Sequence, residues 1–362
     1  MKNNILTITP KLNSVLFVLL MVLFNACTDP EKQGAAETTV EEDKVNIQQT
    51  FDDVLQCVEN FKNGNSIDVI FRDFLNLSNG EPLNDLWLEE LTSDLSSVIN
   101  LDDIENNQRF DISFYAATYT YNIANSSWSK TLDQSNRVVF EFPSKPTATE
   151  NNAELVLENF VDAGVTIDSE TIYLPVSFDM IFDVDGARVT EINLNNVQYA
   201  SNADFEIPVV LDLSIFMDPL TMTFAVSRNS TTSFNLLFTA TDDDACDISL
   251  AGSLELDHDD YENLKETDIK KVTFELKLNK LKVQSLSGIA EFIKSEDRTE
   301  NDFNTLIDLE VLFEDVKIGD LEWDETNDAF IIVYKDGTKE DSAIYHDGFF
   351  DDLADLWVEF FG

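Results

Sequence analysis

The sequence predicts an α+β fold, in which N-terminal helices pack on a large antiparallel sheet and a C-terminal amphipathic helix docks on the same core. Up to about residue 100, apolar residues recur at intervals of three and four, which is typical of amphipathic helices. After Arg109 they alternate with polar residues, which is typical of half-buried strands. The chain is 43% apolar and contains 27 Phe, enough for a packed core. We expect one domain over 46–362, with two lobes, 46–245 and 246–362, as the alternative.

Amphipathic helices are expected at both ends of this domain, three of them at its start. The apolar spacing predicts helices over 47–61, 67–75 and 83–98, and Gly64-Asn65 ends the first. The fourth is a C-terminal helix over 349–361, where large apolar residues form a stripe. These residues are Phe349, Leu353, Leu356, Trp357 and Phe360.

The region between these helices is predicted to be rich in strands, with Asp185-Gly186 as a type I′ hairpin turn. The segment 153–161 fits a helix or a strand, and 286–294 fits a short helix followed by a polar loop. Over 209–240 the alternation places mainly Phe, Leu, Val and Met on one face. A twisted sheet of this size is expected to curl and enclose a groove. The predicted strands cover 110–114, 118–121, 137–142, 171–182, 189–199, 209–216, 221–227, 233–240, 271–283, 306–313, 316–323, 329–334 and 343–346.

The first 26 residues have the organisation of a secretory signal peptide. Lys2 and Lys11 are cationic, and no acidic residue precedes Cys27. An apolar run over 15–24 follows, and Ala26 supplies a small residue before Cys27. This run is too short to span a bilayer, because a transmembrane helix needs about 20 apolar residues. We therefore expect residues 1–26 to be removed on export.

The end of this segment, from Leu23 through Ala26 to Cys27, resembles the signal of bacterial lipoproteins. The resemblance implies cleavage before Cys27, a diacylglycerol on its sulfur and a further acyl chain on its amine. Two or more acyl chains hold a protein stably on a membrane. Residues 27–45 would then be the lipidated cysteine and a flexible tether. The expected location is the cell envelope, at the outer membrane, with the periplasmic or surface face left open.

A second resemblance concerns the segment from Thr118 through Trp128 to Pro143. It is similar to a pattern that recurs in uncharacterised lipoproteins of the Bacteroidota. That resemblance implies no role for any residue.

The charge of the chain excludes several kinds of partner. The formal net charge is −47, and loss of Lys2 and Lys11 with the signal would make it −49. Nucleic-acid binding needs clustered Lys and Arg, so we expect no nucleic-acid partner. Direct docking on an anionic leaflet is disfavoured for the same reason. The expected membrane contact is therefore the lipid on Cys27, and the identity of any protein or small-molecule partner stays open.

Two cysteines remain beyond Cys27. Cys57 lies on the apolar edge of a predicted helix, and Cys246 lies in an acidic break between strands. Export permits a disulfide between them, since exported proteins meet oxidising conditions. A buried free thiol at Cys57 is the competing interpretation, and it is the more ordinary one for a cysteine on an apolar helix edge. No Cys-rich metal motif is present.

Two acidic clusters, over 242–247 and 257–262, are candidate calcium ligands. Calcium takes about six to eight oxygen ligands, so two loops could supply a site. Neither cluster matches the calcium-binding loop that has Gly at its sixth position and Glu at its twelfth. With 70 acidic residues in the chain, such clusters arise from composition alone. We expect solvated loops and no bound metal.

No residue pattern predicts catalysis. The two histidines, His258 and His346, are too few for a histidine-based zinc site, and His258 lies among acidic residues. The sequence has no Gly-x-Ser-x-Gly turn, phosphate-binding loop or dinucleotide fingerprint. No pair of carboxylates stands out for glycoside hydrolysis. We expect no enzymatic activity, no catalytic residues and no cofactor.

The tryptophans offer a further candidate site. Trp87 and Trp357 lie on apolar helix faces and are expected in the core. Trp128 and Trp323 lie next to predicted turns, where an exposed indole could stack on a sugar ring. Packing in the core is the competing interpretation for both.

Together these features predict a lipid-anchored envelope protein with a non-enzymatic binding or structural role. A carrier of apolar ligands such as lipids, with a pocket under a curved sheet, is the first alternative. An envelope glycoside hydrolase or glycan-binding protein is the second. A continuous apolar surface would favour the carrier, and converging carboxylates would favour the hydrolase.

Overall fold

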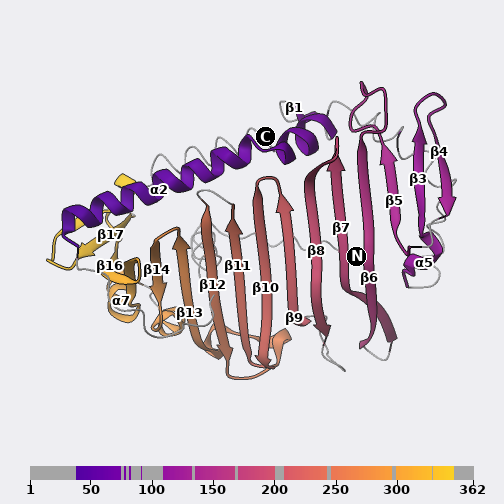
Figure 1. Ribbon diagram of the computed structural model, residues 1–362. Coiled ribbons are helices and arrows are strands. Elements are labelled where there is room, and N and C mark those ends of the chain that lie inside the picture. The colour runs from indigo at the N-terminus through magenta and orange to yellow at the C-terminus, as the bar shows by residue number, and fades with distance from the viewer. Residues whose placement is uncertain are drawn as a thin grey trace. The chain divides into compact units, whose positions relative to one another are not determined.

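The protein is mostly β, as the computed structural model in Figure 1 shows. Sixteen strands form one sheet, in the order β18-β17-β16-β15-β14-β13-β12-β11-β10-β9-β8-β7-β6-β5-β3-β4, and β1 pairs with β2. No helix among the described residues is long and apolar enough to cross a membrane. The structure describes residues 38–74, 77–78, 81–82, 91, 109–132, 135–167, 170–199, 208–242, 246–295, 299–327 and 329–345.

The chain divides into two compact units that interleave along the sequence. Unit 1 comprises Met1–Asp52, Arg228–Thr239 and Asp247–His346. Unit 2 comprises Asp53–Ser227, Ala240–Cys246 and Asp347–Gly362. This division differs from the two-lobe alternative, 46–245 and 246–362. Unit 1 includes the start of the domain, up to Asp52, together with segments that follow Ser227.

Helix α2, Val40–Lys62, begins before the expected end of the tether at residue 45. Thr39 Oγ1 accepts a hydrogen bond from Glu42 N, and Glu42 accepts one from Thr39 N at 2.8 Å. This capping box satisfies main-chain donors at the helix start, and Val40 is already buried. The boundary predicted from composition was therefore wrong, because the polar residues of the first turn hid a folded segment.

Unit 2 contains eight consecutive strands, seen from β3 to β10 in Figure 1. Consecutive neighbours are antiparallel in the pairs from β5 to β10, and β3 pairs with β5 in parallel. The segment 153–161, which fitted either state, is a strand. The eight strands are β3 Ala117–Asn122, β4 Ser127–Leu132, β5 Val138–Phe142, β6 Ala153–Ile167, β7 Glu170–Val184, β8 Ala187–Tyr199, β9 Pro208–Met217 and β10 Leu220–Ser230.

Apart from the second half of α2, the helical elements of unit 2 are short. The helix predicted over 67–75 is present as η1, Ile67–Phe74, a π-helix, and short strands β1, Leu77–Ser78, and β2, Glu81–Pro82, follow it. The strand predicted over 110–114 is wrong: these residues hold helix α5, Ile112–Tyr115. Asp111 caps this helix by accepting a hydrogen bond from Ser113 N at 3.0 Å. The predicted helices over 83–98 and 349–361 lie outside the described residues, apart from Leu91.

The core of unit 2 lies on one face of its strands. Tyr119, Trp128, Phe142 and Phe182 are buried in it, with Val69 and Ile70 of η1 packed against them. Ring contacts link these side chains: the Phe142 and Phe182 rings stack with centroids 6.1 Å apart. Aromatic pairs of this kind add to the stabilisation from burial alone.

Unit 1 contains strands β11 to β18, and its strands differ from the predicted ones in three places. Strand β12 was not predicted, because acidic breaks flank it. The single strand predicted over 271–283 is a hairpin, β13 and β14, with Asn279 at positive φ. The strand predicted over 343–346 is instead a helical turn at 343–345. The strands are β11 Ser233–Thr241, β12 Asp247–Leu256, β13 Ile269–Leu278, β14 Leu281–Ser285, β15 Leu309–Phe313, β16 Val316–Asp324, β17 Ala329–Tyr334 and β18 Lys339–Asp341.

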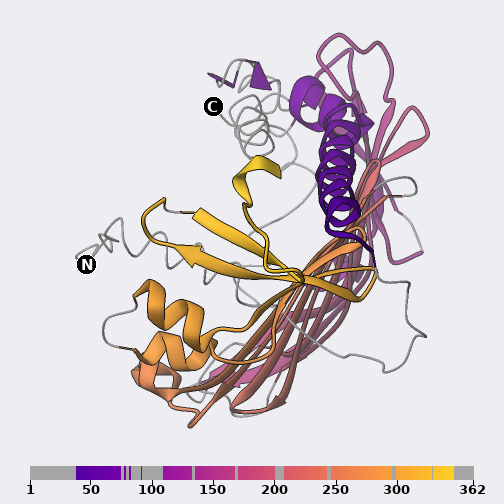
Figure 2. The same cartoon turned by 90° about the vertical axis from the view of Figure 1, so that its left-hand side faces the viewer.

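Two helices of unit 1 lie together against its strands (Figure 2). Helix α6, Ile289–Lys294, was predicted, whereas α7, Glu300–Leu306, falls in a predicted loop. Their side chains form one core with β13, β15 and β17, and Phe292 meets Phe303 edge to face at 5.4 Å. Two 3-10 turns, η3 Tyr261–Asn263 and η4 Glu266–Asp268, complete the unit.

Candidate functional site

A disulfide joins the two cysteines of the described chain. Cys57, in the second half of α2, is bonded to Cys246, which follows β11. Both side chains are buried, at 3% and 4% exposure. The Cys246 main chain is fixed by Asp242, whose carboxylate accepts from Cys246 N at 2.8 Å. The interpretation that the sequence favoured at Cys57, a buried free thiol, is therefore wrong.

The sheet of unit 2 separates apolar from polar side chains between its two faces. Cross-strand pairing places Phe178, Leu194, Leu213 and Phe224 in one row across β7, β8, β9 and β10. Side chains of directly paired residues lie on the same face of a sheet. A second apolar row on this face, two residues along each strand, consists of Met180, Ile192, Ile215 and Met222.

The row between these two lies on the opposite face and is polar. It consists of Asp179, Asn193, Ser214 and Thr223. Ile181 and Phe216, which both pair with Glu191, interrupt this polar face. We call the first surface the apolar face of β7–β10 and the second its polar face. The alternation predicted over 209–240, with apolar residues on one face, is confirmed for β9 and β10.

The apolar face is only partly taken up by the core of unit 2. Leu194 and Phe182 are buried, but the side chains that β9 and β10 contribute to the two rows are half-buried and belong to none of the cores of the described chain. The width of four strands is about 15 Å, since neighbouring strands lie about 4.8 Å apart. Contiguous apolar surface of this kind marks a place where another apolar group packs.

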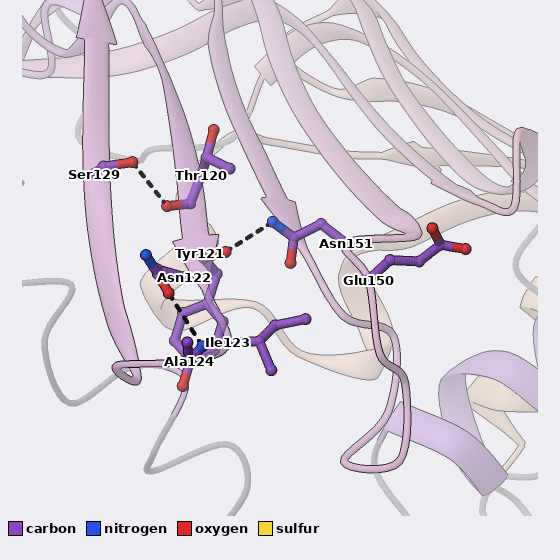
Figure 3. A pocket seen from close by; sticks show the side chains of 8 residues that line it. All are labelled: Thr120, Tyr121, Asn122, Ile123, Ala124, Ser129, Glu150 and Asn151. Carbon is purple, nitrogen blue, oxygen red and sulfur yellow. Dashed lines mark hydrogen bonds between the residues drawn. The ribbon is translucent and has the colours of Figure 1, made fainter.

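A shallow hollow of about 420 Å³ lies at one end of β3 (Figure 3). Thr120, Tyr121 and Asn122 line it from β3, and Glu150 and Asn151 line it from the segment before β6. Asn151 Nδ2 donates to the Tyr121 main-chain oxygen at 2.8 Å, and its Oδ1 is buried without a hydrogen-bond partner. Glu150 is its one carboxylate, so the hollow lacks the pair that glycoside hydrolysis requires.

The tryptophans are packed and do not form a sugar platform in the described chain. Trp128 is 8% exposed, and its Nε1 donates to the Leu91 main-chain oxygen at 2.6 Å. It contacts Tyr121 edge to face at 5.3 Å. Trp323 is half-buried and meets Phe330 at 5.0 Å in the core of unit 1. The exposed position considered for Trp128 is wrong, because its ring fills the core beside β3.

Described side chains of the acidic clusters, and acidic side chains next to them, form local hydrogen bonds. Asp260 bonds the side chain of Asn263, and Asp268 accepts from Lys265 N at 2.8 Å. His258 lies 3.2 Å from Asp268 and accepts from Asp260 N. Within the described ranges, no group of three or more His, Cys, Asp or Glu side chains could hold a metal ion.

A cluster of charged and phenolic groups in unit 1 was not predicted. Lys44 of α2 donates to Glu340 at 2.9 Å and lies 5.5 Å above the Tyr334 ring. Tyr334 and Tyr345 each donate to the same Glu340 oxygen, and their hydroxyls are 2.9 Å apart. Beside them, Asp43 is fully buried and forms an ion pair with Lys335 at 3.2 Å. We call these six residues the N-terminal clasp, because they attach the start of α2 to β17 and β18.

The clasp shifts the ionisation of its members. Burial alone would raise the pKa of Glu340, but hydrogen bonds from Tyr345, Lys44 and Tyr334 outweigh it and hold that pKa below its usual value. Burial, and then the hydrogen bond to Glu340, raise the pKa of Tyr345 to about 12. Burial likewise raises the pKa of Tyr334. The carboxylate is therefore kept charged and the phenols neutral, as a stable hydrogen-bonded network requires.

Several predicted residues lie outside the described residues: Cys27, Trp87, His346 and Trp357. The clasp, in contrast, was missed although its members are described. Its residues are separated by up to about 300 positions in sequence, as in the hydrogen bond from Lys335 to the Thr38 oxygen, which joins residues 297 apart. No local sequence pattern connects groups at such separations.

The comparisons with known proteins give no relative. No protein family model, no curated protein and no solved structure matches the chain.

Proposed function

We propose that the protein is a lipid-anchored lipoprotein of the bacterial cell envelope, held at the outer membrane through Cys27, with a non-enzymatic binding or structural role. The proposal is supported first by the N-terminal sequence: two lysines, an apolar run too short to span a bilayer, and Ala26 before Cys27. In this proposal the membrane is the first partner, and no cofactor or metal takes part.

The disulfide is the structural observation that carries the export part of the proposal. Disulfides between buried cysteines persist in oxidising compartments and are rare in the reducing cytosol. Cys57 and Cys246 are the two cysteines beyond the proposed lipid site, and they are bonded to each other. The signal-like N-terminus and the disulfide are independent features, and both are consistent with export.

Replacement of Cys27 by Ser tests the anchor. Cells that express the wild-type chain and the variant are labelled with a fatty-acid probe and then fractionated. We expect label on the wild-type chain only, and we expect the variant to leave the membrane fraction. A Cys57→Ser chain is the matched control and should stay labelled. Label on the Cys27→Ser chain would show that the anchor is assigned to the wrong residue.

The apolar face of β7–β10 favours a second candidate function, the carrier of an apolar ligand. Two complete rows of large apolar side chains cross four strands, and those of β9 and β10 are half-buried. No charged residue interrupts either row. An acyl chain fits this surface chemically, because it needs apolar contact along its length and no hydrogen-bond partner.

Strands β9 and β10 offer a matched pair of variants for this candidate. Leu213 pairs with Phe224 on the apolar face, and Ser214 pairs with Thr223 on the polar face. Binding of a fluorescent fatty acid is measured for Leu213→Asn/Phe224→Asn and for Ser214→Asn/Thr223→Asn. Burial of such side chains contributes about 1.5–3 kcal/mol each, so the first variant should bind at least about tenfold more weakly.

The polar-face variant should bind like the wild-type chain in this experiment. Circular dichroism of both variants checks that the sheet is intact. If the wild-type chain binds no fatty acid, or if both variants bind equally well, the carrier function is rejected and the non-enzymatic binding or structural role remains. A hydrolase or a glycan-binding protein has less support, since the hollow has one carboxylate and Trp128 is buried.

A further inference from the structure

Thr38 is attached to unit 1 by side chains of the N-terminal clasp. Its main-chain oxygen accepts a hydrogen bond from Lys335 Nζ, and its Oγ1 donates to Asp43. Lys335 comes from the turn after β17, so one ammonium group holds both Thr38 and the buried carboxylate of Asp43. The path of the chain is therefore fixed to unit 1 immediately before α2 begins.

This attachment has a cost in free energy. Asp43 is fully buried, and taking a carboxylate out of water is repaid only when its ion pair and hydrogen bonds have good geometry. An apolar contact between α2 and the sheet would stabilise unit 1 as well, and Ile47 already provides one. What the polar groups add is a defined position, because directional bonds from Lys335 and Glu340 allow one placement of the helix start.

The clasp fixes the position of Thr38, and the chain that precedes Thr38 connects it to Cys27. Thr38 lies eleven positions after Cys27 in the sequence. A chain of this length spans at most about 40 Å when fully extended.

We propose that the N-terminal clasp orients unit 1 on the membrane, so that the edge formed by the start of α2 and the turn 335–338 faces the lipid surface at a distance of no more than about 40 Å. This inference rests on the proposed lipid anchor at Cys27. The bilayer is reached through the tether and is not docked directly, because a chain with a net charge of −47 is repelled by anionic headgroups.

Two labelling positions on unit 1 test this orientation. Glu41 is exposed on the first turn of α2, next to the clasp, and Glu325 is exposed in the turn between β16 and β17. The turn at Glu325 lies at the opposite end of β17 from the turn 335–338. Six residues of strand separate the two ends by about 20 Å.

The experiment uses the full acylated chain in phosphatidylcholine vesicles that carry an energy acceptor on some headgroups. A donor dye is placed on Glu41→Cys or on Glu325→Cys, and the remaining cysteines are acylated or disulfide-bonded. We expect higher transfer efficiency from position 41 than from position 325. Equal efficiencies, or the reverse order, would overturn the proposed orientation.

Two further variants test the tether and the clasp separately. Twenty Gly and Ser residues inserted between Gly34 and Ala35 should increase the mean separation about 1.7-fold and at least halve the transfer from position 41. Lys335→Gln should reduce the difference in transfer between positions 41 and 325, because the start of α2 is then held less firmly to unit 1. Lys339→Gln, which breaks an exposed ion pair with Glu322, should leave that difference unchanged. Transfer that is unchanged by the insertion, or a difference between the two positions that both lysine variants reduce equally, would contradict the proposal.

Failure of this inference can be distinguished from failure of the anchor. If mass spectrometry finds no acyl chains on Cys27, the proposed function fails. If the chain is acylated and floats with the vesicles but shows the wrong order of transfer, the anchor stands and the proposed orientation fails.

Discussion

Loss of the disulfide between Cys57 and Cys246 should strongly destabilise the protein. The bond joins residues 189 apart in sequence. On the chain-entropy model, closing a loop of this length in the unfolded state is worth about 5 kcal/mol, and measured effects are usually about 2–4 kcal/mol. A typical domain is stable by about 5–15 kcal/mol. We therefore expect Cys57→Ala/Cys246→Ala to lose a large share of the margin of unit 2, in which both cysteines lie.

The assay is urea unfolding of the chain released from the membrane by Cys27→Ser. Each single variant, Cys57→Ala and Cys246→Ala, should be about as unstable as the double variant, because either change breaks the same bond. A reducing agent should lower the unfolding midpoint of the parent and leave that of the double variant unchanged. Titration of the unfolded parent with a thiol reagent should find no free thiol.

The competing interpretation makes opposite predictions in the same assay. If both cysteines are free thiols, the effects of the single variants add in the double variant. The reducing agent then has no effect on the parent, and the thiol titration finds two groups. That combination would refute the disulfide, and it would also remove the structural support for export.

Three further predictions concern the metal, the clasp and the C-terminus. Neither calcium nor a chelator should shift the melting temperature. A large rise with calcium would instead indicate a calcium site in the clusters over 242–247 and 257–262, because a ligand that binds the native state stabilises it. The pKa of Tyr345 is raised to about 12, so its contribution to stability is present below about pH 10 and is lost as the pH rises through 12. Tyr345→Phe should therefore flatten the alkaline fall of the urea midpoint, and an unchanged fall would contradict the network. Removal of 349–362 should lower the melting temperature sharply. Burial of each large apolar side chain of the predicted helix would contribute about 1.5–3 kcal/mol to the free energy of unfolding, and the truncation would remove several of them. A soluble chain with an unchanged melting temperature would indicate that the apolar stripe is exposed.

Local patterns in the sequence were enough to predict most of the strands. The alternation over 209–227 gave both the strands and the apolar side of the sheet, because side chains of a strand point to opposite faces in turn. Asp185-Gly186 marked the hairpin between β7 and β8, where both residues have positive φ. Patterns of this kind work because the physical cause lies within a few residues.

The local errors have causes that the sequence also contains. Thr299 and Asp302 form a capping box at the start of α7, and this signal was present but outweighed by the polar composition of the loop. The same signal, Thr39 with Glu42, was missed at the start of α2. In α5, apolar alternation suggested a strand, and the cap at Asp111 decided for a helix.

The disulfide and the N-terminal clasp could not be predicted in the same way. Two cysteines can be bonded only if the fold brings their Cα atoms to within about 7 Å, and the spacing in sequence does not contain that information. The clasp unites Lys44 with Glu340 and Asp43 with Lys335, across nearly the whole described chain. Both features are properties of the tertiary structure.

The charge of the protein bears on what the apolar face can bind. Strands β7 to β9 carry Asp179, Glu191 and Asp212 on the polar face, which is the opposite face of the sheet from the apolar rows. A second copy of this chain, docked through its own apolar face, would bring another net charge of −47. The mutual repulsion of two such charges opposes stacking, and it weakens as salt is added. An uncharged acyl chain meets no such repulsion, so its binding should be nearly independent of salt, whereas pairing of two copies should strengthen markedly with salt.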